Sequence, residues 1–128
     1  MRILGLGVDI ININRIKMIL NRNKKFVEKI FSKKEILYCN KKKAKEFCFA
    51  KRFAAKEAFS KALGTGISKG LNFKEIEVIK EDSGKPSLSI KGKSLLVVKK
   101  TLKKDNFVVF LSISDDKPFA VATVIIAH

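Results

Sequence analysis

The 128-residue chain contains no tryptophan, two cysteines and a single histidine, and these scarcities narrow the chemistry open to it. The histidine, His128, is the last residue, and because chain ends are usually mobile we expect no histidine in a catalytic centre. Cys39 and Cys48 follow neither a CxxC nor a Cys/His spacing, so we expect neither a zinc site nor a disulfide. A carboxylate, a lysine or water must therefore act wherever a general base is needed.

Long apolar runs are also missing. The apolar stretch Ile3 to Ile11 is interrupted by Asp9 and falls far short of the roughly 20 residues that a membrane span needs. With no membrane segment and no signal peptide visible, we expect a cytoplasmic protein. Apolar residues make up 46% of the chain, so we expect one globular domain over residues 1–128.

Negative charge is scarce, since 12 Asp and Glu stand against 28 Lys and Arg, for a net charge of +16. Most of the excess lies in residues 1–64, which carry 17 basic and 5 acidic side chains. Such a field attracts nucleic acid, an anionic membrane, a phosphorylated cofactor or an acidic protein. Lysine outnumbers arginine 24 to 4, however, and coding bias that fills solvated faces with lysine explains many of these positions equally well.

The residue pattern predicts an α+β fold, with a mostly antiparallel sheet packed on a long helix. The long helix is the clearest element, because residues 44–63 are rich in helix formers, lack Pro and Gly, and precede Gly64. A capping box of Ser32 and Glu35 opens another helix. The other expected elements are a strand over residues 3–9, helices over 14–20, 26–31 and 94–104, a hairpin over 73–92, and two strands over 106–114 and 119–127.

Two acidic side chains occupy positions that call for a partner. Asp9 lies in an otherwise apolar strand, where an unpaired carboxylate is expensive to bury. Phe49, Phe53, Glu57 and Lys61 recur every four residues, so an apolar stripe on one helix face continues into an acid and a base. Two carboxylates from separate elements suit Mg²⁺, which also binds waters and substrate phosphates.

The glycine turn after Lys61 extends this prediction towards a phosphate ligand. Exposed backbone N–H groups around Gly64–Gly66 and the Lys61 ammonium suit a pyrophosphate. Each feature also has an ordinary structural explanation. Asp9 could pair with Arg15 or a lysine, Glu57 could form an i,i+4 salt bridge with Lys61, and the glycines could merely end the helix.

Two longer motifs connect these residues to a known family. G-V-D-I-x4-R-I at residues 7–16 and F-A-A-K-E-A-F-S-K-A-L-G-T-G-I at residues 53–67 resemble the signatures of holo-acyl-carrier-protein synthase, the short type of phosphopantetheinyl transferase. The resemblance continues through G-K-P at 84–86, L-S-I-S at 111–114 and A-V-A-T-V-I-I at 120–126. It therefore covers essentially the whole chain.

The resemblance implies a role for each residue in the motifs. Asp9 and Glu57 would bind Mg²⁺ together with the coenzyme A pyrophosphate, and Lys61 would meet a phosphate. Arg15 would contact the acidic acyl carrier protein, in basic surroundings over residues 15–34. The coenzyme-binding positions would be Ser60, Gly64 and Thr65, with Arg52 and Pro86 near the adenosine end.

The reaction implied is attack of a carrier-protein serine on the β-phosphorus of coenzyme A, which releases adenosine 3',5'-bisphosphate and supports fatty acid biosynthesis. The serine proton would go to a metal-proximal water or to a carboxylate, with Glu57 and Glu35 both candidates. The resemblance also implies a homotrimer with each coenzyme site between subunits. One position departs from the family, since Asp115 stands where members often have a histidine near the 3'-phosphate, and Lys117 or another lysine could substitute.

Two other functions compete with this interpretation. A basic nucleic-acid-binding module would rest on charge, but the ten Phe and one Tyr fall largely at core-like spacing and only four Arg are available. A Mg²⁺-dependent nuclease would also use Asp, Glu and Lys. Strand-based nuclease sites, however, need an acid and a lysine two residues apart, whereas Glu57 and Lys61 are four apart on a helix. We therefore expect no specific nucleic-acid partner, and no membrane partner.

Overall fold

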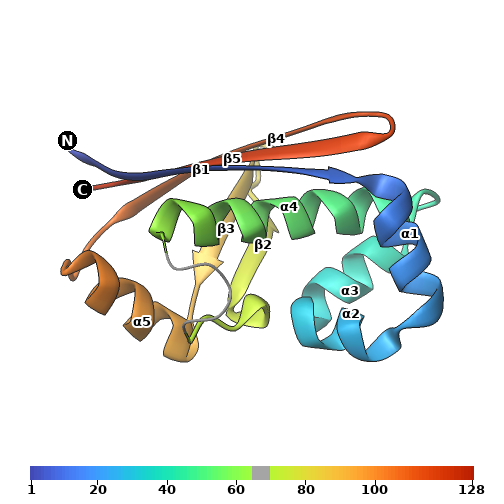
Figure 1. The fold of residues 1–128 in the computed structure, drawn as a ribbon, viewed down its shortest axis with the longest axis horizontal. Helices are drawn as coiled ribbons and strands as arrows, with labels where there is room; N and C mark the ends of the chain where they lie inside the picture. The colour runs from blue at the N-terminus through green and yellow to red at the C-terminus, as the bar shows by residue number, and fades with distance from the viewer. Residues whose placement is uncertain (65–69) are drawn as a thin grey trace.

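A three-stranded antiparallel sheet lies lengthwise on one long helix in the computed structural model, which describes residues 1–64 and 70–128. The strands are β1 (Ile3–Asn12), β5 (Phe119–Ala127) and β4 (Val108–Asp116), in the order β1-β5-β4. The helix is α4 (Lys45–Leu63), and it runs beneath the sheet in Figure 1. β1 and β4 are therefore the two outer strands, one on each flank of α4.

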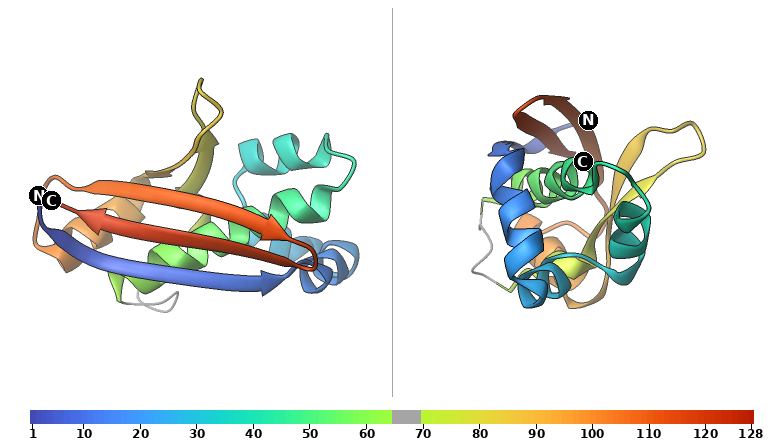
Figure 2. Two further views of the ribbon diagram at one scale, coloured as in Figure 1. Left: turned by 90° about the horizontal axis from the view of Figure 1, so that it is seen from above. Right: turned by 90° about the vertical axis from the view of Figure 1, so that its right-hand side faces the viewer.

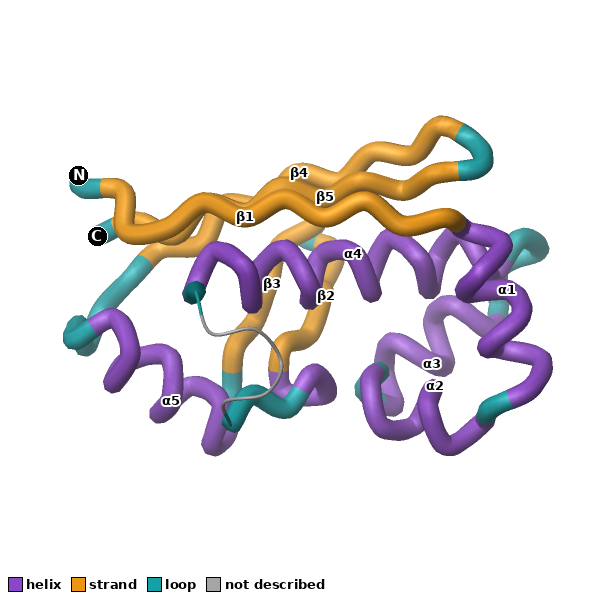
Figure 3. Tube along the Cα trace, viewed as in Figure 1, coloured by secondary structure: helices purple, strands orange, loops and turns teal. Residues whose placement is uncertain are grey.

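The remaining elements surround the ends of α4. Three short helices follow β1, namely α1 (Ile13–Arg22), α2 (Lys24–Ile30) and α3 (Lys33–Asn40). The 3₁₀ turn η1 (Phe73–Glu75) leads into a two-stranded antiparallel sheet of β2 (Ile76–Lys80) and β3 (Pro86–Ile90), and α5 (Gly92–Leu102) follows. Figure 2 shows the β2–β3 hairpin on the side of β4, away from β1. In Figure 3 the helices gather on the α4 side of the three-stranded sheet.

Two glycines let β1 approach α4 more closely than any other residue would allow. A Cβ atom at Gly5 would collide with the backbone carbonyl of Ala62, and one at Gly7 with that of Ala58. Ala58 and Ala62 are themselves small, which brings the two backbones together. This approach holds Asp9, the next inward-facing residue of β1, against the C-terminal half of α4.

A buried ion pair joins α3 to α4. The Lys56 side chain is 0% exposed, and its ammonium donates to Oε1 of Glu35 at 2.7 Å and to the carbonyl oxygens of Phe73 and Ile76, each at 2.7 Å. Oε2 of Glu35 accepts a hydrogen bond from the backbone N–H of Val78 at 3.0 Å. These contacts stabilise the junction of α3, α4 and the second sheet, because nearly every polar atom of the pair has a partner.

The sheet face that points away from α4 is apolar and exposed. Alternate residues of the strands are buried against α4, and the others face outward without a covering element among the described residues (Figure 2). Exposed apolar side chains on this face include Leu6, Val8, Ile10, Phe110 and Phe119. An apolar surface of this kind marks an interaction site.

The elements agree closely with the sequence-based expectations, with one error at the cysteines. The α+β class, the antiparallel pairing, the capping box of Ser32 and Glu35 and the end of the long helix at Gly64 are confirmed. The expectation of no disulfide is wrong, because Cys39 and Cys48 are bonded, with Cα atoms 5.5 Å apart. Packing of α3 on α4 brings the two residues together, which their spacing along the chain did not indicate.

No helix in the described part of the chain is both long enough and apolar enough to cross a membrane.

Candidate functional site

Asp9 and Lys61 form an ion pair across the contact between β1 and α4. The Lys61 ammonium donates to Oδ1 of Asp9 at 3.0 Å and to the carbonyl oxygen of Val8 at 3.2 Å. The Asp9 side chain is 15% exposed and that of Lys61 is 53% exposed, so the carboxylate lies at the base of the site while the ammonium reaches it from solvent. The pairing explains how an acid is tolerated in an apolar strand.

Glu57 lies one helical turn before Lys61, and its electrostatic surroundings are unfavourable for a lone carboxylate. Burial raises the pKa of Glu57 above its ordinary value, the negative charge of Asp9 raises it further, and Lys61 acts in the opposite direction. Lys61, one turn after Glu57 on the same helix face, reaches Oδ1 of Asp9 at 3.0 Å, so both carboxylates lie on this side of α4. One lysine and two acids therefore form a centre that a cation would stabilise.

The carboxylates of Asp9 and Glu57 suit a hard divalent cation whose remaining positions are filled by water or by a substrate. Among the described residues no group of three or more His, Cys, Asp or Glu side chains gathers at one point, so Asp9 and Glu57 are the carboxylates available here. Mg²⁺ is commonly held by one or two carboxylates, with waters and substrate phosphates completing its shell. A site with two carboxylates and an adjacent ammonium suits that combination better than a closed, all-protein metal cage.

The end of α4 supplies backbone and small side chains beside this centre. Ser60 is fully buried, and its hydroxyl donates to the carbonyl oxygen of Glu57 at 3.0 Å. Gly64 ends the helix in the left-handed conformation, with φ at 86°, and, its chain neighbours apart, no other atom of residues 1–64 and 70–128 lies within 4 Å of where a Cβ would be. Thr65, also expected in the coenzyme-binding segment, lies outside the described residues.

Arg52 and Pro86, the residues expected near the adenosine end, line a second hollow of about 220 Å³. This hollow lies where α3, α4, the β2–β3 hairpin and β4 meet. Its other lining residues are Tyr38, Lys51, Val78, Lys80, Gly84, Ile113 and Asp115. It shares Tyr38, Lys51 and Arg52 with an adjoining hollow of about 380 Å³, which extends towards Lys42 and Lys43.

Positive charge surrounds the Tyr38 ring in this region. The Arg52 guanidinium lies 4.6 Å from the ring centroid and the Lys42 ammonium 4.7 Å from it. Although burial acts to raise the pKa of Tyr38, Lys42 lowers it on balance, with smaller effects from Lys80 and Arg52. Arg52 also donates through Nη1 to Sγ of Cys48 at 3.2 Å, while its buried Nε has no partner among the described residues.

The two groups of predicted residues lie on opposite flanks of α4. Arg52 and Lys61 are nine positions apart, which at 3.6 residues per turn corresponds to two and a half turns. Asp9 lies on the outer strand β1, and Asp115, which lines the hollow of Arg52, lies on the other outer strand β4. The helix and the width of the sheet therefore separate the two groups within one chain.

The other two predicted residues, Glu35 and Arg15, do not lie at the acidic centre. Glu35 is 2% exposed, and its carboxylate accepts hydrogen bonds from Lys56, from the N–H of Ser32 and from the N–H of Val78. Arg15 is exposed on α1, at the start of a segment over residues 15–34 that carries eight Lys or Arg and one acidic residue, Glu28. Glu35 is thus held by hydrogen bonds within the fold, whereas the exposed Arg15 can contact another protein.

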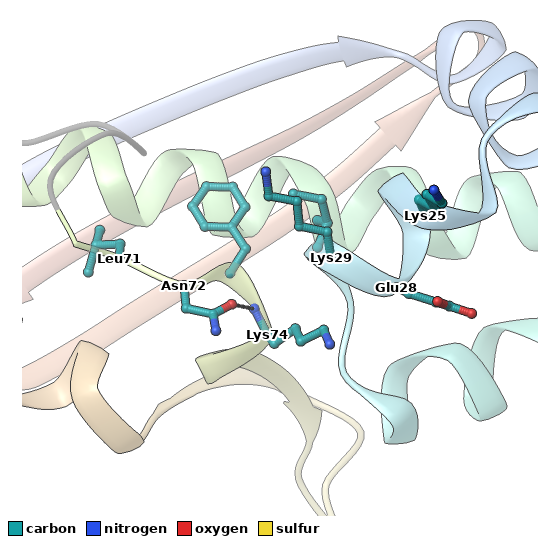
Figure 4. A pocket seen from close by; sticks show the side chains of 8 residues that line it. Lys25, Glu28, Lys29, Leu71, Asn72 and Lys74 are labelled. Carbon is teal, nitrogen blue, oxygen red and sulfur yellow. Dashed lines mark hydrogen bonds between the residues drawn. The ribbon is translucent and has the colours of Figure 1, made fainter.

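A third hollow, of about 510 Å³, was not indicated by the sequence. Figure 4 shows Lys25 and Lys29 of α2 on one side and Leu71 and Asn72 on the other. Phe73 also lines it, and the Phe73 ring packs against Phe53, with centroids 6.4 Å apart. Phe53 precedes Glu57 by one helical turn, so the ring that packs against Phe73 lies on the same face of α4 as Glu57 and Lys61.

Comparison with known proteins places the chain in one family. Residues 5–124 match the family described as the 4'-phosphopantetheinyl transferase superfamily. The chain is 50% identical over 126 residues to a holo-(acyl-carrier-protein) synthase of Pelagibacter ubique, covering 98% of each. It is 48% identical over 118 residues to the enzyme of the same name from Clostridium acetobutylicum, covering 92% of each.

Solved structures agree with these relatives. A holo-(acyl-carrier-protein) synthase of Bacillus anthracis, in complex with CoA (3',5'-ADP), is 40% identical with a TM-score of 0.80, and the match covers 99% of this chain and 98% of the other. The Helicobacter pylori enzyme in complex with coenzyme A is 34% identical with a TM-score of 0.78, over 95% of this chain and 99% of the other.

Proposed function

Because this chain belongs to the 4'-phosphopantetheinyl transferase superfamily, we propose that Asp9, Glu57 and Lys61 form the centre at which it transfers 4'-phosphopantetheine from coenzyme A to a serine of apo acyl carrier protein. The reaction releases adenosine 3',5'-bisphosphate, and it serves fatty acid biosynthesis in the cytoplasm. The observation that carries the proposal is the meeting of two carboxylates and one ammonium where β1 touches α4.

Transfer needs little covalent help from the protein. The serine Oγ attacks the β-phosphorus of coenzyme A, the P–O bond to the adenosine-bearing phosphate breaks, and that oxygen leaves with adenosine 3',5'-bisphosphate. Catalysis of such a step rests on positioning and on neutralising the negative charge that builds on the phosphates. Lys61 supplies a fixed positive charge for this purpose, since its ammonium is already held at the centre by Asp9.

Mg²⁺ is the metal that this centre fits. Asp9 and Glu57 would hold it, and when bound it would neutralise the pyrophosphate and relieve the repulsion that raises the pKa of Glu57. The serine proton would pass to Glu57, directly or through a water. We assign Glu35 a structural role instead, because its oxygens already accept hydrogen bonds from Lys56, Ser32 and Val78.

The coenzyme spans two subunits in this proposal. Arg52 and Pro86 would hold the nucleotide end, while Ser60, Gly64 and Thr65 would lie beside the pyrophosphate. Since α4 separates the first group from the acidic centre of the same chain, the hollow of one subunit must face the acidic centre of the next. Contacts of this head-to-tail kind close into a ring, and we propose a homotrimer.

The exposed face of the three-stranded sheet supports assembly. Side chains such as Leu6, Val8 and Ile10 would leave water when three sheets meet face to face around the ring axis. Introducing a charge there, as in Val8→Glu, should therefore yield a monomer that keeps its helical circular dichroism but loses transferase activity. Sedimentation in the ultracentrifuge measures the assembly, and a fully active monomer would exclude the shared site.

The acidic carrier protein would dock on the basic helices. Arg15 is exposed on α1, and Lys25 and Lys29 of α2 line the hollow of about 510 Å³. Opposite charges steer two such proteins together and accelerate association. The same surface also attracts nucleic acid without specificity, so retention of DNA does not test the function.

The direct test is the mass of an acyl carrier protein. Apo carrier protein incubated with this protein, coenzyme A and Mg²⁺ should gain one phosphopantetheine group, and chelation of the metal should stop the gain. Asp9→Ala and Glu57→Ala should abolish it while leaving the fold intact. If several apo carrier proteins gain no mass with the wild-type protein, the proposed activity is wrong.

Mixing variants tests whether the site is shared. Arg52→Ala and Glu57→Ala chains should each be nearly inactive alone, and trimers co-assembled from equal amounts should regain about a quarter of the wild-type activity. That fraction follows because random assembly pairs an intact acidic centre with an intact neighbouring hollow at about one site in four. A site contained within one chain would give no recovery.

A further inference from the structure

Lys51 lies between the two hollows that surround Tyr38 and is only loosely paired. Its ammonium is 3.6 Å from Oδ1 of Asp115, which is longer than a hydrogen bond, and the two side chains are 36% and 35% exposed. Lys51 lines both the hollow of about 220 Å³ and the hollow of about 380 Å³. Its N–H donors therefore face space that a ligand can fill.

The charge around this lysine calls for an anion. The side chains that line the two hollows carry five positive charges, and Asp115 is the only carboxylate among them. The cations are Lys42, Lys43, Lys51, Arg52 and Lys80. Without a negative partner these five cations would repel one another, and the single charge of Asp115 offsets only one of them. A phosphomonoester, which carries nearly two negative charges at neutral pH, would compensate more of them.

We propose that Lys51 is the residue that binds the 3'-phosphate of coenzyme A, with Asp115 holding the ammonium beside Arg52. The inference rests on the proposed function. Since the pyrophosphate belongs to Asp9, Glu57 and Lys61, the 3'-phosphate is the anionic group left for the hollow on the other flank. The bound form in the Bacillus anthracis relative, CoA (3',5'-ADP), carries a phosphate at that position.

This assignment accounts for the acid at position 115. A carboxylate alone would repel a phosphate, but Lys51 lies 3.6 Å from Asp115 and offsets its charge, and the other four cations keep the lining of the two hollows positive. Lys117, the substitute named from the sequence, lies in the turn after β4 and does not line either hollow. Lys51 of α4 would thus supply the phosphate contact that a histidine at position 115 gives in many family members.

The test compares ligands that differ only in the 3'-phosphate. Calorimetry with the full-length protein should give tighter binding of adenosine 3',5'-bisphosphate than of adenosine 5'-monophosphate. In Lys51→Ala the Kd of the bisphosphate should rise about tenfold, as expected for loss of one charge-assisted hydrogen bond, and that of the monophosphate should stay within twofold. Lys51→Arg should retain most of the difference.

A matched lysine on the same helix serves as the control. Lys45 is exposed at the start of α4 and lines neither hollow, so Lys45→Ala removes the same charge without touching the proposed contact. It should leave both dissociation constants within twofold. The proposal is overturned if Lys51→Ala weakens both nucleotides equally, weakens neither, or behaves as Lys45→Ala does.

Kinetics give a second readout and separate this inference from the proposed function. Lys51→Ala should raise the KM for coenzyme A about tenfold, leave kcat within twofold, and leave the KM for coenzyme A lacking its 3'-phosphate unchanged. The calorimetric experiment contains no carrier protein. Loss of transfer with every carrier would therefore sink the proposed function, while Lys51-dependent bisphosphate binding would still uphold the phosphate contact.

Discussion

Lys61 donates to Oδ1 of Asp9 at 3.0 Å, which joins two residues that lie 52 positions apart in the sequence. The bond crosses the contact between α4 and β1, and Lys61 also holds the carbonyl oxygen of Val8. The ammonium is thus the partner of the carboxylate that we assign to Mg²⁺. Lys61 and the metal share Asp9, and this relationship leads to a test.

Replacing Lys61 with alanine should separate metal binding from turnover. Removal of the competing ammonium should tighten Mg²⁺ binding to the coenzyme-free protein a few fold, as measured by calorimetry. Loss of the charge that stabilises the phosphates should lower kcat by about 10²–10³-fold. If the variant binds Mg²⁺ more weakly and turns over normally, Lys61 only positions Asp9 and takes no part in transfer.

Glu57→Gln should stabilise the metal-free protein while it abolishes activity. The pKa of Glu57 is raised above its ordinary value of 4.5 by burial and by Asp9, so in the folded state the carboxyl keeps its proton to a higher pH than in the unfolded chain. The free energy of unfolding therefore falls as the pH rises through the folded pKa, because ionisation is more costly in the folded protein. Because glutamine does not ionise, the variant should not lose this part of the free energy of unfolding at neutral pH.

Thermal melts in chelator at a series of pH values check this prediction. The melting temperature of Glu57→Gln should exceed that of the wild type at pH 7, and the gap should close as the pH falls below 4.5 and Glu57 becomes protonated. Mg²⁺ should raise the melting temperature of the wild type but not of the variant. A variant less stable than the wild type at pH 7 would mean that Glu57 is not held in unfavourable surroundings.

Gly7 sets the distance between β1 and α4, and its replacement should damage both stability and the site. A Cβ at this position meets the carbonyl oxygen of Ala58, a backbone atom that cannot turn aside. Gly7→Ala should cost about 2–3 kcal/mol in urea unfolding and reduce Mg²⁺ affinity by moving Asp9 away from Glu57. Gly84→Ala, in an open turn with φ at 90°, should cost about 1 kcal/mol and leave the metal site unchanged.

The acidic centre could be predicted from the sequence because its signals are local. Asp9 is conspicuous in an apolar strand, and the spacing of Glu57 and Lys61 places them on one helix face whatever the rest of the fold does. The helix ends were equally readable, since the capping box and Gly64 act within a few residues of the backbone groups that they satisfy.

Features that depend on packing between distant elements could not be read in the same way. The partner of Asp115 is Lys51, 64 positions earlier, and nothing in the spacing of either residue distinguishes it from other lysines. Glu35 has a clear local role at the start of α3, but its buried partner Lys56 follows only from the packing of α3 on α4. The cysteine pair was missed for the same reason.

The Cys39–Cys48 disulfide should contribute measurably to stability. It closes a short loop, with a sequence separation of 9, for which the loss of unfolded-chain entropy corresponds to about 2–3 kcal/mol. Urea unfolding with and without reductant, and of a Cys39→Ala/Cys48→Ala variant, measures the difference. Peptide mapping without reductant should recover the two cysteines in one linked fragment, and free thiols in the purified native protein would contradict the bond.

The buried pair of Lys56 and Glu35 provides the last test, because it also decides between the two candidate general bases. Lys56→Met leaves the Glu35 carboxylate, 1% exposed, without its cation and should cost about 3–5 kcal/mol. Glu35→Gln should lower stability less and should recover part of the loss when combined with Lys56→Met, since a neutral amide needs no counter-charge.

Activity measurements on the same variants distinguish a structural role of Glu35 from a catalytic one. A structural Glu35 predicts that folded Glu35→Gln keeps kcat within a few fold and the pH dependence of the wild type, whereas a catalytic Glu35 predicts loss of turnover at undiminished substrate binding. Lys45→Met, a change of the same kind at an exposed position of α4, should shift stability by less than about 0.5 kcal/mol. Because Glu35 already accepts three hydrogen bonds from within the fold, we expect the structural outcome, which leaves Glu57 as the acceptor of the serine proton.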